Sequence, residues 1–580
     1  MPRPIVWTLR IAALLALLLP VRALAQTQPP ADLIFHGGKV WTVDESRPVA
    51  QAVAVRGNRI VRVGSNREVL ALRGPATEVV DLRGRLLLPG FNDGHTHFEN
   101  AADWFYEVMI TNATDVNVIY DQLRLAVARV PEGMWITGGP FATFGRAPHL
   151  FAPELRVLDE IAPNHPVLIR RYDGTGFANT RALQTIRITR GSANPGGGEY
   201  VRDAAGNLTG ELRGTAYERI FRSMPPPSRA SKLIGARAVQ REFNRHGITT
   251  IHDIARVDAL SQREIFHSHV ERSASDLGIF TYLHAAGELT VRLRPILSLN
   301  TWQGLAGLGL TPGAGDDMIR YYGGLKAFVD GYLMFEGRVN NPENRGDFTF
   351  RFIDEPTIEN EIVRSAGAGY RPAVHVVGDR AIHLLLNWYE KAIAEHGLTD
   401  PRFRVIHMFY PRPEEIERAG RLRLVADVTP DHFLRDYRNL EASLGPERAR
   451  WAHAYASMLR AGMRLNIVTD WPGSFWKTEG IAPIDPMENI YLVVTRQDSE
   501  GWPAGGWHPE ERLTVQQAIR AMTLTPAEST FEEDRLGSIT EGKLADLVVL
   551  SRDILTIPHR EILDTHVDIT VLDGRIVHRR

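Results

Sequence analysis

The sequence predicts an α/β protein built on a (β/α)8 barrel with insertions, with a small β-domain assembled from both ends of the chain. The chain has 580 residues, more than one ordinary core can hold. Its middle alternates short apolar runs with helix-like stretches at a spacing of roughly thirty to sixty residues, which is typical of repeated βα units. Its two ends hold short strand-like runs around glycine turns instead.

The first 25 residues have the pattern of a secretory signal peptide and are not expected in the fold. Arg3 and Arg10 precede an apolar run, Ile11–Leu19. Pro20 ends that run, and Ala23-Leu24-Ala25 forms a small-residue cleavage site. A membrane anchor is the alternative, but the run is short for a span. We expect export, with a periplasmic or secreted protein released after cleavage near Ala25.

Both ends of the mature chain read as short strands. Neither end has enough apolar surface to fold alone, so we expect the two ends to pair into one β-domain into which the middle is inserted. The strand-like runs cover residues 32–43, 52–63, 78–82, 545–550 and 568–578.

The middle of the chain supplies about eight strands over about 400 residues, as a (β/α)8 barrel requires. The expected strands include residues 247–253, 279–284, 322–330, 372–377, 403–407, 424–428 and 464–470. Helical patterns lie between them, at residues 231–246, 358–368, 380–396, 413–420 and 447–461. A doubly wound open sheet is the alternative arrangement. Residues 131–230 break the alternation, and we expect them to form an insertion over one end of the barrel, as a lid or substrate wall.

Composition excludes several classes of protein. The 67 basic residues nearly cancel the 69 acidic ones, and no dense basic patch indicates nucleic acid. Beyond the signal, no segment is long and apolar enough to cross a bilayer, so the mature form is expected to be free of the membrane. The chain has no cysteine. A metal would therefore be held by histidine, carboxylate or a group built from lysine.

The stretch Phe91-Asn-Asp-Gly-His-Thr-His-Phe98 places two imidazoles one residue apart at the end of an apolar run. Alternate residues of a strand point to the same side, so His95 and His97 form a chelating pair. Zn²⁺ and similar cations bind imidazole nitrogen well. The alternative is a pair of polar loop residues, because so short a motif also occurs by chance.

Further metal-competent side chains follow later strands. His375 ends one apolar strand, His407 ends the next, and Asp470 ends a later one. The carboxyl ends of the strands form the active-site face of a (β/α)8 barrel. A single histidine at a strand end would be weak evidence for a metal site. The whole set of histidines and Asp470 at strand ends is much harder to explain by chance.

Lys326 lies in the middle of an otherwise apolar or small strand. A buried ammonium is costly unless it is paired. Three explanations are an ion pair with Asp330, a lysine whose amine reaches solvent, and a carbamate formed with CO₂ that would bridge two metals. From spacing alone, the ion pair is the default.

Together these motifs resemble the metal-dependent amidohydrolase superfamily. The quoted residues are Pro89-Gly-Phe-Asn-Asp-Gly-His-Thr-His97, His375, His407 and Thr469-Asp470. Four further segments are similar to the N-substituted formamide deformylase-like (YtcJ-like) branch: Gly247–Asp253, Leu325–Gly331, His375–Asp379 and Asp470–Pro472. The resemblance runs from about residue 32 to the end. It implies a distorted TIM barrel over residues 89–529, and a composite β-sandwich from residues 32–88 and 530–580.

The resemblance also implies roles for individual residues. His95, His97, His375 and His407 would be metal ligands, and Asp470 would be both a ligand and the general base. Lys326 matches a position where a carboxylated lysine can bridge two metals, so one or two divalent ions, zinc first, are expected. The implied activity is hydrolysis of carbon–nitrogen bonds other than peptide bonds. Hydrolysis of lactones or other esters on the same centre, and a non-catalytic metal- or ligand-binding barrel, are the alternatives.

The chain departs from the branch in the inserted region. The branch has Asp-Gly-His there, whereas this chain reads Tyr172-Asp-Gly-Thr175. Another departure is Val428-Thr-Pro-Asp-His432, where the branch has Gln-Pro before a strand-end histidine. The weaker candidates for substrate contact are His432, Trp471, Arg146 and Tyr172. The expected partner is a small-molecule substrate, and a homo-oligomer is left open.

Overall fold

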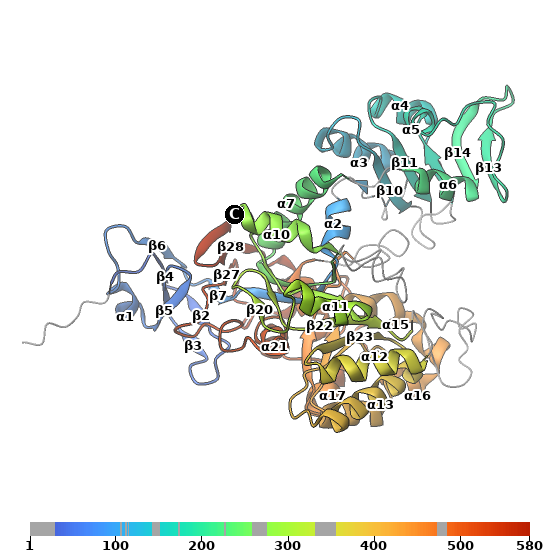
Figure 1. Cartoon of the computed structure of the whole chain (residues 1–580). Coiled ribbons are helices and arrows are strands. Elements are labelled where there is room, and N and C mark those ends of the chain that lie inside the picture. Colours follow the sequence, from blue (N-terminus) through green and yellow to red (C-terminus); the bar gives the residue numbers. More distant parts are fainter. Residues whose placement is uncertain are drawn as a thin grey trace, which may run out of the picture.

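The computed structural model shows an α/β protein with a terminal β region, a central α/β body and a separate lobe (Figure 1). It describes residues 29–104, 107–108, 110, 113, 115–141, 151–171, 175–224, 228–257, 275–330, 355–472 and 484–580. The predicted signal peptide lies outside these residues. Among the helices of the described part, none has the length and apolar character needed to cross a membrane.

Two sheets form the terminal β region, at the left of Figure 1. One has the order β5-β4-β1-β6 and the other β29-β28-β27-β7-β2-β3. The strands of the first are β1 (Leu33–His36), β4 (Ala52–Arg56), β5 (Arg59–Gly64) and β6 (Glu78–Asp81). Those of the second are β2 (Lys39–Trp41), β3 (Val49–Ala50), β7 (Leu86–Pro89), β27 (Leu547–Leu550), β28 (Val567–Leu572) and β29 (Arg575–Arg579).

The second sheet joins the two ends of the chain. Strand β7 pairs antiparallel with β27, so that Leu88 lies opposite Val548. Side chains from both sheets share one apolar core, which includes Phe35 and Leu87 from the first end and Val549 from the other. Burying these faces together supplies the apolar area that neither end has alone.

Two parallel sheets form the central body. The smaller has the order β18-β15-β8 and the larger β19-β22-β23-β24-β25-β26. Their strands are β8 (Phe91–Thr96), β15 (Ile248–Asp253), β18 (Arg292–Leu293), β19 (Ile296–Ser298), β22 (Gly324–Phe328), β23 (Arg371–Val376), β24 (Arg404–His407), β25 (Val425–Val428) and β26 (Arg464–Ile467). Most are buried along their whole length, as expected for parallel strands covered on both faces.

Helices cover the outside of these sheets. They include α7 (Arg229–Arg245), α12 (Glu355–Gly367), α13 (Asp379–His396), α14 (Pro413–Arg421), α15 (Pro430–Leu444), α17 (Tyr455–Arg460), α19 (Pro486–Thr495) and α20 (Val515–Ala521). Helix α13 illustrates why: Ile382, Leu385 and Tyr389 recur at helical spacing and are all buried. It ends at Gly397, whose φ of 59° suits glycine.

Contacts in two places join the parallel sheets. In one place an isolated parallel bridge joins Ile254, which follows β15, to Ile296 of β19. In the other place the contact lies just beyond the strand ends. The Asp470 amide donates to the His95 carbonyl, and the His97 amide donates to the Trp471 carbonyl, both at 2.9 Å. These bonds bring the two most distant strands of the body together at their carboxyl ends.

The expected strand at residues 279–284 is wrong, because these residues lie in helix α10 (Leu277–Ala285). Asp276 caps that helix by accepting a hydrogen bond from the Gly278 amide at 2.8 Å. The strands that follow β15 in the parallel sheets are β18 and β19. The expected helix at 447–461 is divided into α16 (Pro446–Ala449) and α17.

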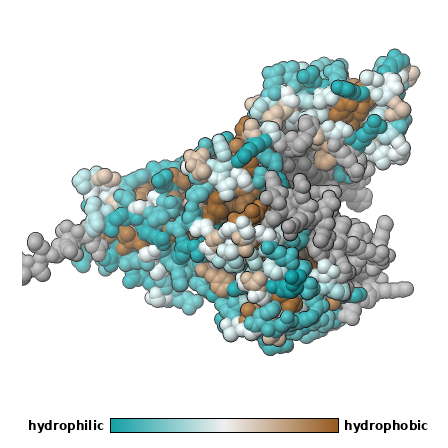
Figure 2. Space-filling view, in the orientation of Figure 1, coloured by the Kyte–Doolittle hydropathy of each residue, from teal (hydrophilic) through white to brown (hydrophobic). Residues whose placement is uncertain are grey.

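The inserted region forms a lobe with its own sheet, at the upper right of Figure 1. The order of the sheet is β13-β14-β12-β11-β10-β9. The strands are β9 (Glu107–Val108), β10 (Ile136–Phe141), β11 (Val167–Arg171), β12 (Gly176–Ala178), β13 (Gly198–Arg202) and β14 (Leu208–Gly214). Helices α3 (Val116–Arg129), α4 (Leu155–Ile161), α5 (Thr180–Thr185) and α6 (Thr215–Ser223) flank it. The lobe therefore begins before the predicted boundary at 131. Hydrophilic residues cover much of the face shown in Figure 2, with smaller apolar patches among them.

Candidate metal centre

The centre begins with the two histidines at the end of β8. His95 and His97 are both fully buried, and their ring centroids lie 5.3 Å apart. Strand alternation directs both side chains to one side, as the sequence predicts. Two imidazoles are therefore presented together inside the protein.

Asp470 completes a three-residue cluster with this pair. Its Oδ1 atom lies 3.3 Å from Nε2 of His95 and 3.1 Å from Nε2 of His97. The potential ligand atoms of the three residues all lie within 4.8 Å of one another. The backbone hydrogen bond from Asp470 to His95 holds the two segments together. A divalent cation could therefore reach all three side chains at once.

Three further histidines lie around this cluster. The rings of His375 and His407 are 4.5 Å apart, and the His407 ring is 5.7 Å from that of His95. On α15, His432 places Nε2 at 4.0 Å from Oδ2 of Asp470. The structure thus brings the predicted histidines and Asp470 to one place.

Two of these residues have unusual backbone conformations. The φ angles of His407 and Asp470 are 73° and 56°. Positive φ is uncommon for residues other than glycine, and such strain is concentrated at functional sites. His407 is the last residue of β24, and Asp470 follows the end of β26.

Lys326 lies on β22 with 1% of its surface exposed. Its Nζ atom is 4.6 Å from the centre of the Phe328 ring, which itself packs on His375. Burial lowers the pKa of Lys326 to about 7, although the charges of Asp470 and Asp427 act against that shift. At neutral pH a large fraction of this amine is uncharged, the form that reacts with CO₂.

The expected Lys326–Asp330 ion pair is wrong: within the described part of the chain, no such pair forms. The carboxylate oxygens of Asp330 accept hydrogen bonds from the Val377 and Gly378 amides, each at 2.9 Å. Asp330 therefore holds the loop that leads into α13. That role depends on contacts between distant segments, which the spacing of residues 326 and 330 does not reveal.

Burial keeps the imidazoles of His95, His375 and His407 neutral. It lowers the pKa of His95 to about 3, and the nearby Lys326 charge adds to that shift. Burial also lowers the pKa values of His375 and His407 well below the usual range. For Asp470, burial acts to raise the pKa, but the adjacent imidazoles of His95 and His97 hold the pKa well below its ordinary value. Neutral imidazoles and an ionised carboxylate are the forms that bind a metal.

Asp93 ties the His95 segment to the Asp470 segment. Its Oδ1 accepts hydrogen bonds from the amides of His95 (3.2 Å) and Thr469 (3.1 Å). Its Oδ2 accepts one from the Thr469 hydroxyl at 2.5 Å. Burial raises the pKa of Asp93 to about 7, while the bonds from Thr469 act in the opposite direction. The sequence reasoning missed this role, although Asp93 stands in the same short motif as the two histidines.

Three other hydrogen bonds orient the site. Thr96, between the two histidines, donates to Oδ1 of Asp253 at 2.9 Å, and the Phe98 amide donates to the same oxygen at 2.7 Å. The Thr429 hydroxyl lies 3.0 Å from Nδ1 of His407. Such bonds to the far side of a ligand fix its orientation. The partners lie on different strands, so one sequence gives little signal for them.

Unsatisfied polar atoms test whether the residues fit a metal. Within the described structure, neither ring nitrogen of His95, nor Nε2 of His375, nor Oδ1 of Asp470 has a hydrogen-bond partner. Each buried polar atom without a partner costs about 1–3 kcal/mol. A divalent cation would satisfy several at once, and nitrogen and oxygen donors without sulfur suit Zn²⁺. The residues therefore fit a divalent metal.

The weaker candidates have different outcomes. His432 lies beside Asp470, as described. Trp471 lies in the apolar core at 1% exposure, with its ring 5.4 Å from that of Phe243. The ring is directed toward α7, a packing that favours a role in the core over the expected contact with substrate. Arg146 and Tyr172 lie outside the described residues.

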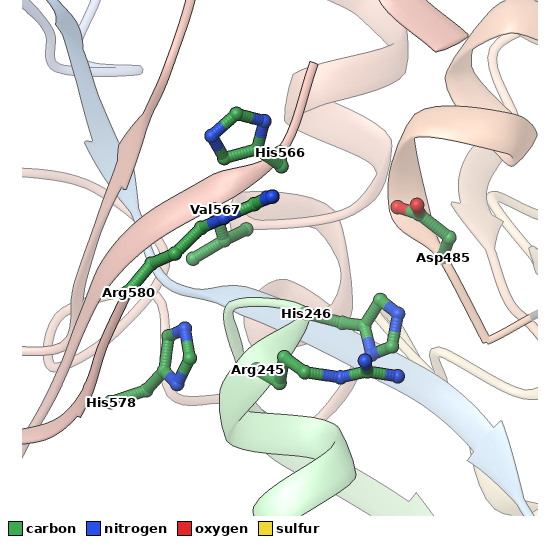
Figure 3. A pocket seen from close by; sticks show the side chains of 7 residues that line it. All are labelled: Arg245, His246, Asp485, His566, Val567, His578 and Arg580. Carbon is green, nitrogen blue, oxygen red and sulfur yellow. The ribbon is translucent and has the colours of Figure 1, made fainter. Parts of the chain in front are cut away.

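A separate cavity of about 360 Å³ lies where α7, α19, β28 and β29 meet (Figure 3). It is lined by Arg245, His246, Asp485, His566, Val567, His578 and Arg580. Arg245 is already paired with Glu242 at 2.6 Å, and His566 lies 3.2 Å from Asp568. The cavity shares no residue with the candidate metal centre, so it adds nothing to that chemistry.

Comparisons with known proteins agree with this geometry. A profile described as the Amidohydrolase family matches residues 78–578. The chain is 30% identical over 532 residues to Protein LONG AFTER FAR-RED 3 of Arabidopsis thaliana, covering 90% of this chain and 87% of that protein. It is 27% identical over 580 residues to N-substituted formamide deformylase of Arthrobacter pascens, covering 95% and 98%. A solved structure described as an uncharacterized metal-dependent hydrolase from Pyrococcus furiosus superposes with a TM-score of 0.67 at 20% identity, covering 90% of this chain and all of that one.

Proposed function

This chain belongs to the amidohydrolase family, and from that premise we propose that it hydrolyses N-substituted formamides or closely related amides. The general class, a metal-dependent hydrolase of carbon–nitrogen bonds, follows from the family. The narrower substrate class is supported by the likeness to the formamide deformylase over nearly the whole of both chains. The observation that carries the proposal is the convergence of His95, His97 and Asp470 on one point in a buried site.

The residues would divide the work of hydrolysis. His95, His97, His375, His407 and Asp470 would hold the metal, which when bound polarises the scissile carbonyl and makes water more acidic. Asp470 is ionised and can take a proton from the attacking water and pass it to the leaving nitrogen. We propose zinc as the ion.

Two residues support a more detailed proposal. Lys326 is buried with a pKa near 7, so we propose that it carries a carboxylate and helps to hold a second metal. His432 lies 4.0 Å from Asp470, which suits a residue that contacts substrate or steadies the general base.

We also propose that the two parallel sheets close into a distorted (β/α)8 barrel over residues 89–529. The bridge between Ile254 and Ile296 and the backbone bonds between the His95 and Asp470 segments support closure. The two terminal sheets, which share a core, would form a composite β-sandwich from residues 32–88 and 530–580. The lobe would form one wall of the substrate entrance.

Export is a further proposal, and it is supported by the pattern of residues 1–25. The mature protein would then be periplasmic or secreted, act on a small molecule, and bind neither nucleic acid nor membrane. A homo-oligomer is compatible with these proposals.

A panel of N-alkylformamides, acetamides, cyclic amides and lactones tests the reaction class. We expect turnover of the amides and about 10²–10⁴-fold less turnover in Asp470→Asn, the range for loss of a general base. Asp485→Asn is the matched control, because Asp485 lies at the separate cavity and caps α19, and asparagine caps equally well. Faster turnover of lactones than of amides would favour the ester alternative. Metal binding without turnover of any compound would favour a binding protein.

A further inference from the structure

His252 is a buried histidine whose hydrogen bonding fixes its protonation. It lies on β15, next to the β8 strand that carries His95, and is fully buried. Its Nδ1 atom is 3.0 Å from Nη1 of Arg404. A guanidinium can only donate hydrogen bonds, so Nδ1 must accept. A ring that accepts at Nδ1 is neutral and carries its proton on Nε2.

Arg404 is itself held rigidly. Nε of Arg404 donates to Asp427 at 2.7 Å, and Nη1 donates to the Tyr322 hydroxyl at 2.8 Å. Nη2 donates to the Gly94 carbonyl. Asp427 accepts a further bond from Asn466 at 2.9 Å. This network ties several strands together and leaves the guanidinium no freedom to release His252.

The Nε2–H group of His252 is a hydrogen-bond donor that lacks an acceptor among the described residues. It has no hydrogen-bond partner anywhere in the described part of the protein. A buried donor without an acceptor costs about 1–3 kcal/mol. Such a group is retained where a ligand supplies the acceptor. In the parallel pairing of β15 with β8, Ile251 lies opposite Asp93 and Asp253 lies opposite Thr96. His252 therefore lies across from the segment that carries His95, beside the candidate metal centre.

We propose that His252 donates a hydrogen bond from Nε2 to the carbonyl oxygen of the bound substrate. The proposal rests on the proposed amide hydrolysis, in which that oxygen gains negative charge. A donor fixed before the reaction stabilises such charge without reorganisation. The Arg404–Asp427 pair then acts as a positioning device, because it sets which nitrogen of His252 carries the proton.

Two variants of similar size test the donor. In His252→Gln the amide can accept from Arg404 and still donate to the substrate, whereas His252→Met can do neither well. We expect kcat to fall about 100-fold or more in His252→Met, the range for loss of one such donor, with unchanged zinc content. His252→Gln should remain within about tenfold of the wild type. Equal losses in both variants would overturn the proposal.

The matched control is His165, a buried histidine of the lobe whose Nδ1 lies 3.1 Å from the Met134 carbonyl. His165→Gln and His165→Met should both keep wild-type kcat for zinc-loaded protein. A loss in the His165 variants equal to that in His252→Met would show that replacing any buried histidine suffices, which contradicts a specific role.

A measurement that needs no turnover separates this proposal from the proposed function. In protein labelled with ¹⁵N-histidine, the His252 signals are assigned by their loss in His252→Gln. We expect protonated Nε2 with and without Zn²⁺, and a shift of that signal when formate is added as an oxygen acceptor. Protonation at Nδ1, loss of the Nε2 proton on adding Zn²⁺, or no response to formate would each overturn the inference. Failure to hydrolyse any amide, with these signals as expected, would reject only the proposed reaction.

Discussion

Replacing Asp93 tests whether the metal ligands depend on the carboxylate behind them. In Asp93→Ala, the amides of His95 and Thr469 lose the oxygen that they share, and the Thr469 hydroxyl loses its acceptor. Each buried donor left unpaired costs about 1–3 kcal/mol, so the two amides alone amount to about 2–6 kcal/mol. Both amides adjoin candidate ligands. We expect part of this cost to appear as displaced ligands and a roughly 10- to 100-fold weaker affinity for Zn²⁺.

The asparagine variant separates hydrogen bonding from charge. Burial raises the pKa of Asp93 to about 7, so the side chain is largely protonated in mildly acid solution. Asparagine resembles that neutral form and keeps one oxygen for the two amides. We therefore expect Asp93→Asn to bind Zn²⁺ within about tenfold of the wild type at pH 6.

Zinc affinity is measured by competition with a chromophoric chelator, and circular dichroism checks folding. The matched control is Asp159 in the lobe, which accepts hydrogen bonds from the Thr180 amide and hydroxyl, each at 2.7 Å. Asp159→Ala also leaves an amide and a hydroxyl without their carboxylate acceptor, but it should bind Zn²⁺ with wild-type affinity. Wild-type zinc affinity in a folded Asp93→Ala would refute the reasoning.

Two further predictions test how the burial of Glu415 and of Trp471 affects the stability of the fold. Glu415→Gln should raise the melting temperature at pH 8 but not at pH 5. Burial raises the pKa of Glu415 from 4.5 to about 7, so the folded protein retains a proton that the unfolded chain releases. The wild-type protein therefore loses free energy of unfolding, on the order of 3 kcal/mol, as pH rises from 4.5 to about 7. Equal shifts of the melting temperature at pH 5 and pH 8 would contradict this prediction. Trp471→Phe should lower the melting temperature, by a loss on the order of 1–2 kcal/mol, without changing KM. A raised KM at unchanged stability would return Trp471 to the substrate site.

The strand ends could be predicted from sequence because they carry local signals. His375 and His407 each close an apolar run, and His95 and His97 follow the two-residue period of a strand. Convergence of these positions follows from the common direction of parallel strands. The histidines of the centre and Asp470 are therefore found together, although they span most of the chain.

The remaining features depend on partners that one sequence does not name. Residues 279–284 have strand-like composition, yet Asp276 begins a helix there. The ion pair between Lys326 and Asp330 looked natural from spacing, but Asp330 bonds to amides near 377 instead. The Arg404 network depends on side chains from several strands meeting in the interior. The cap at Asp276 is a local signal that the strand-like composition of residues 279–284 outweighed, whereas the other two outcomes were decided by tertiary contacts.

The most direct test of the metal centre is a zinc titration of chelator-treated protein, followed by formate release from an N-alkylformamide. We predict that the rate rises with added Zn²⁺ and saturates at one or two ions per chain. Asp470→Asn should gain almost no rate even when its measured zinc content matches the wild type. A rate that is independent of zinc, or an Asp470→Asn variant that follows the wild-type curve, would contradict the assignment of this site as the centre of hydrolysis.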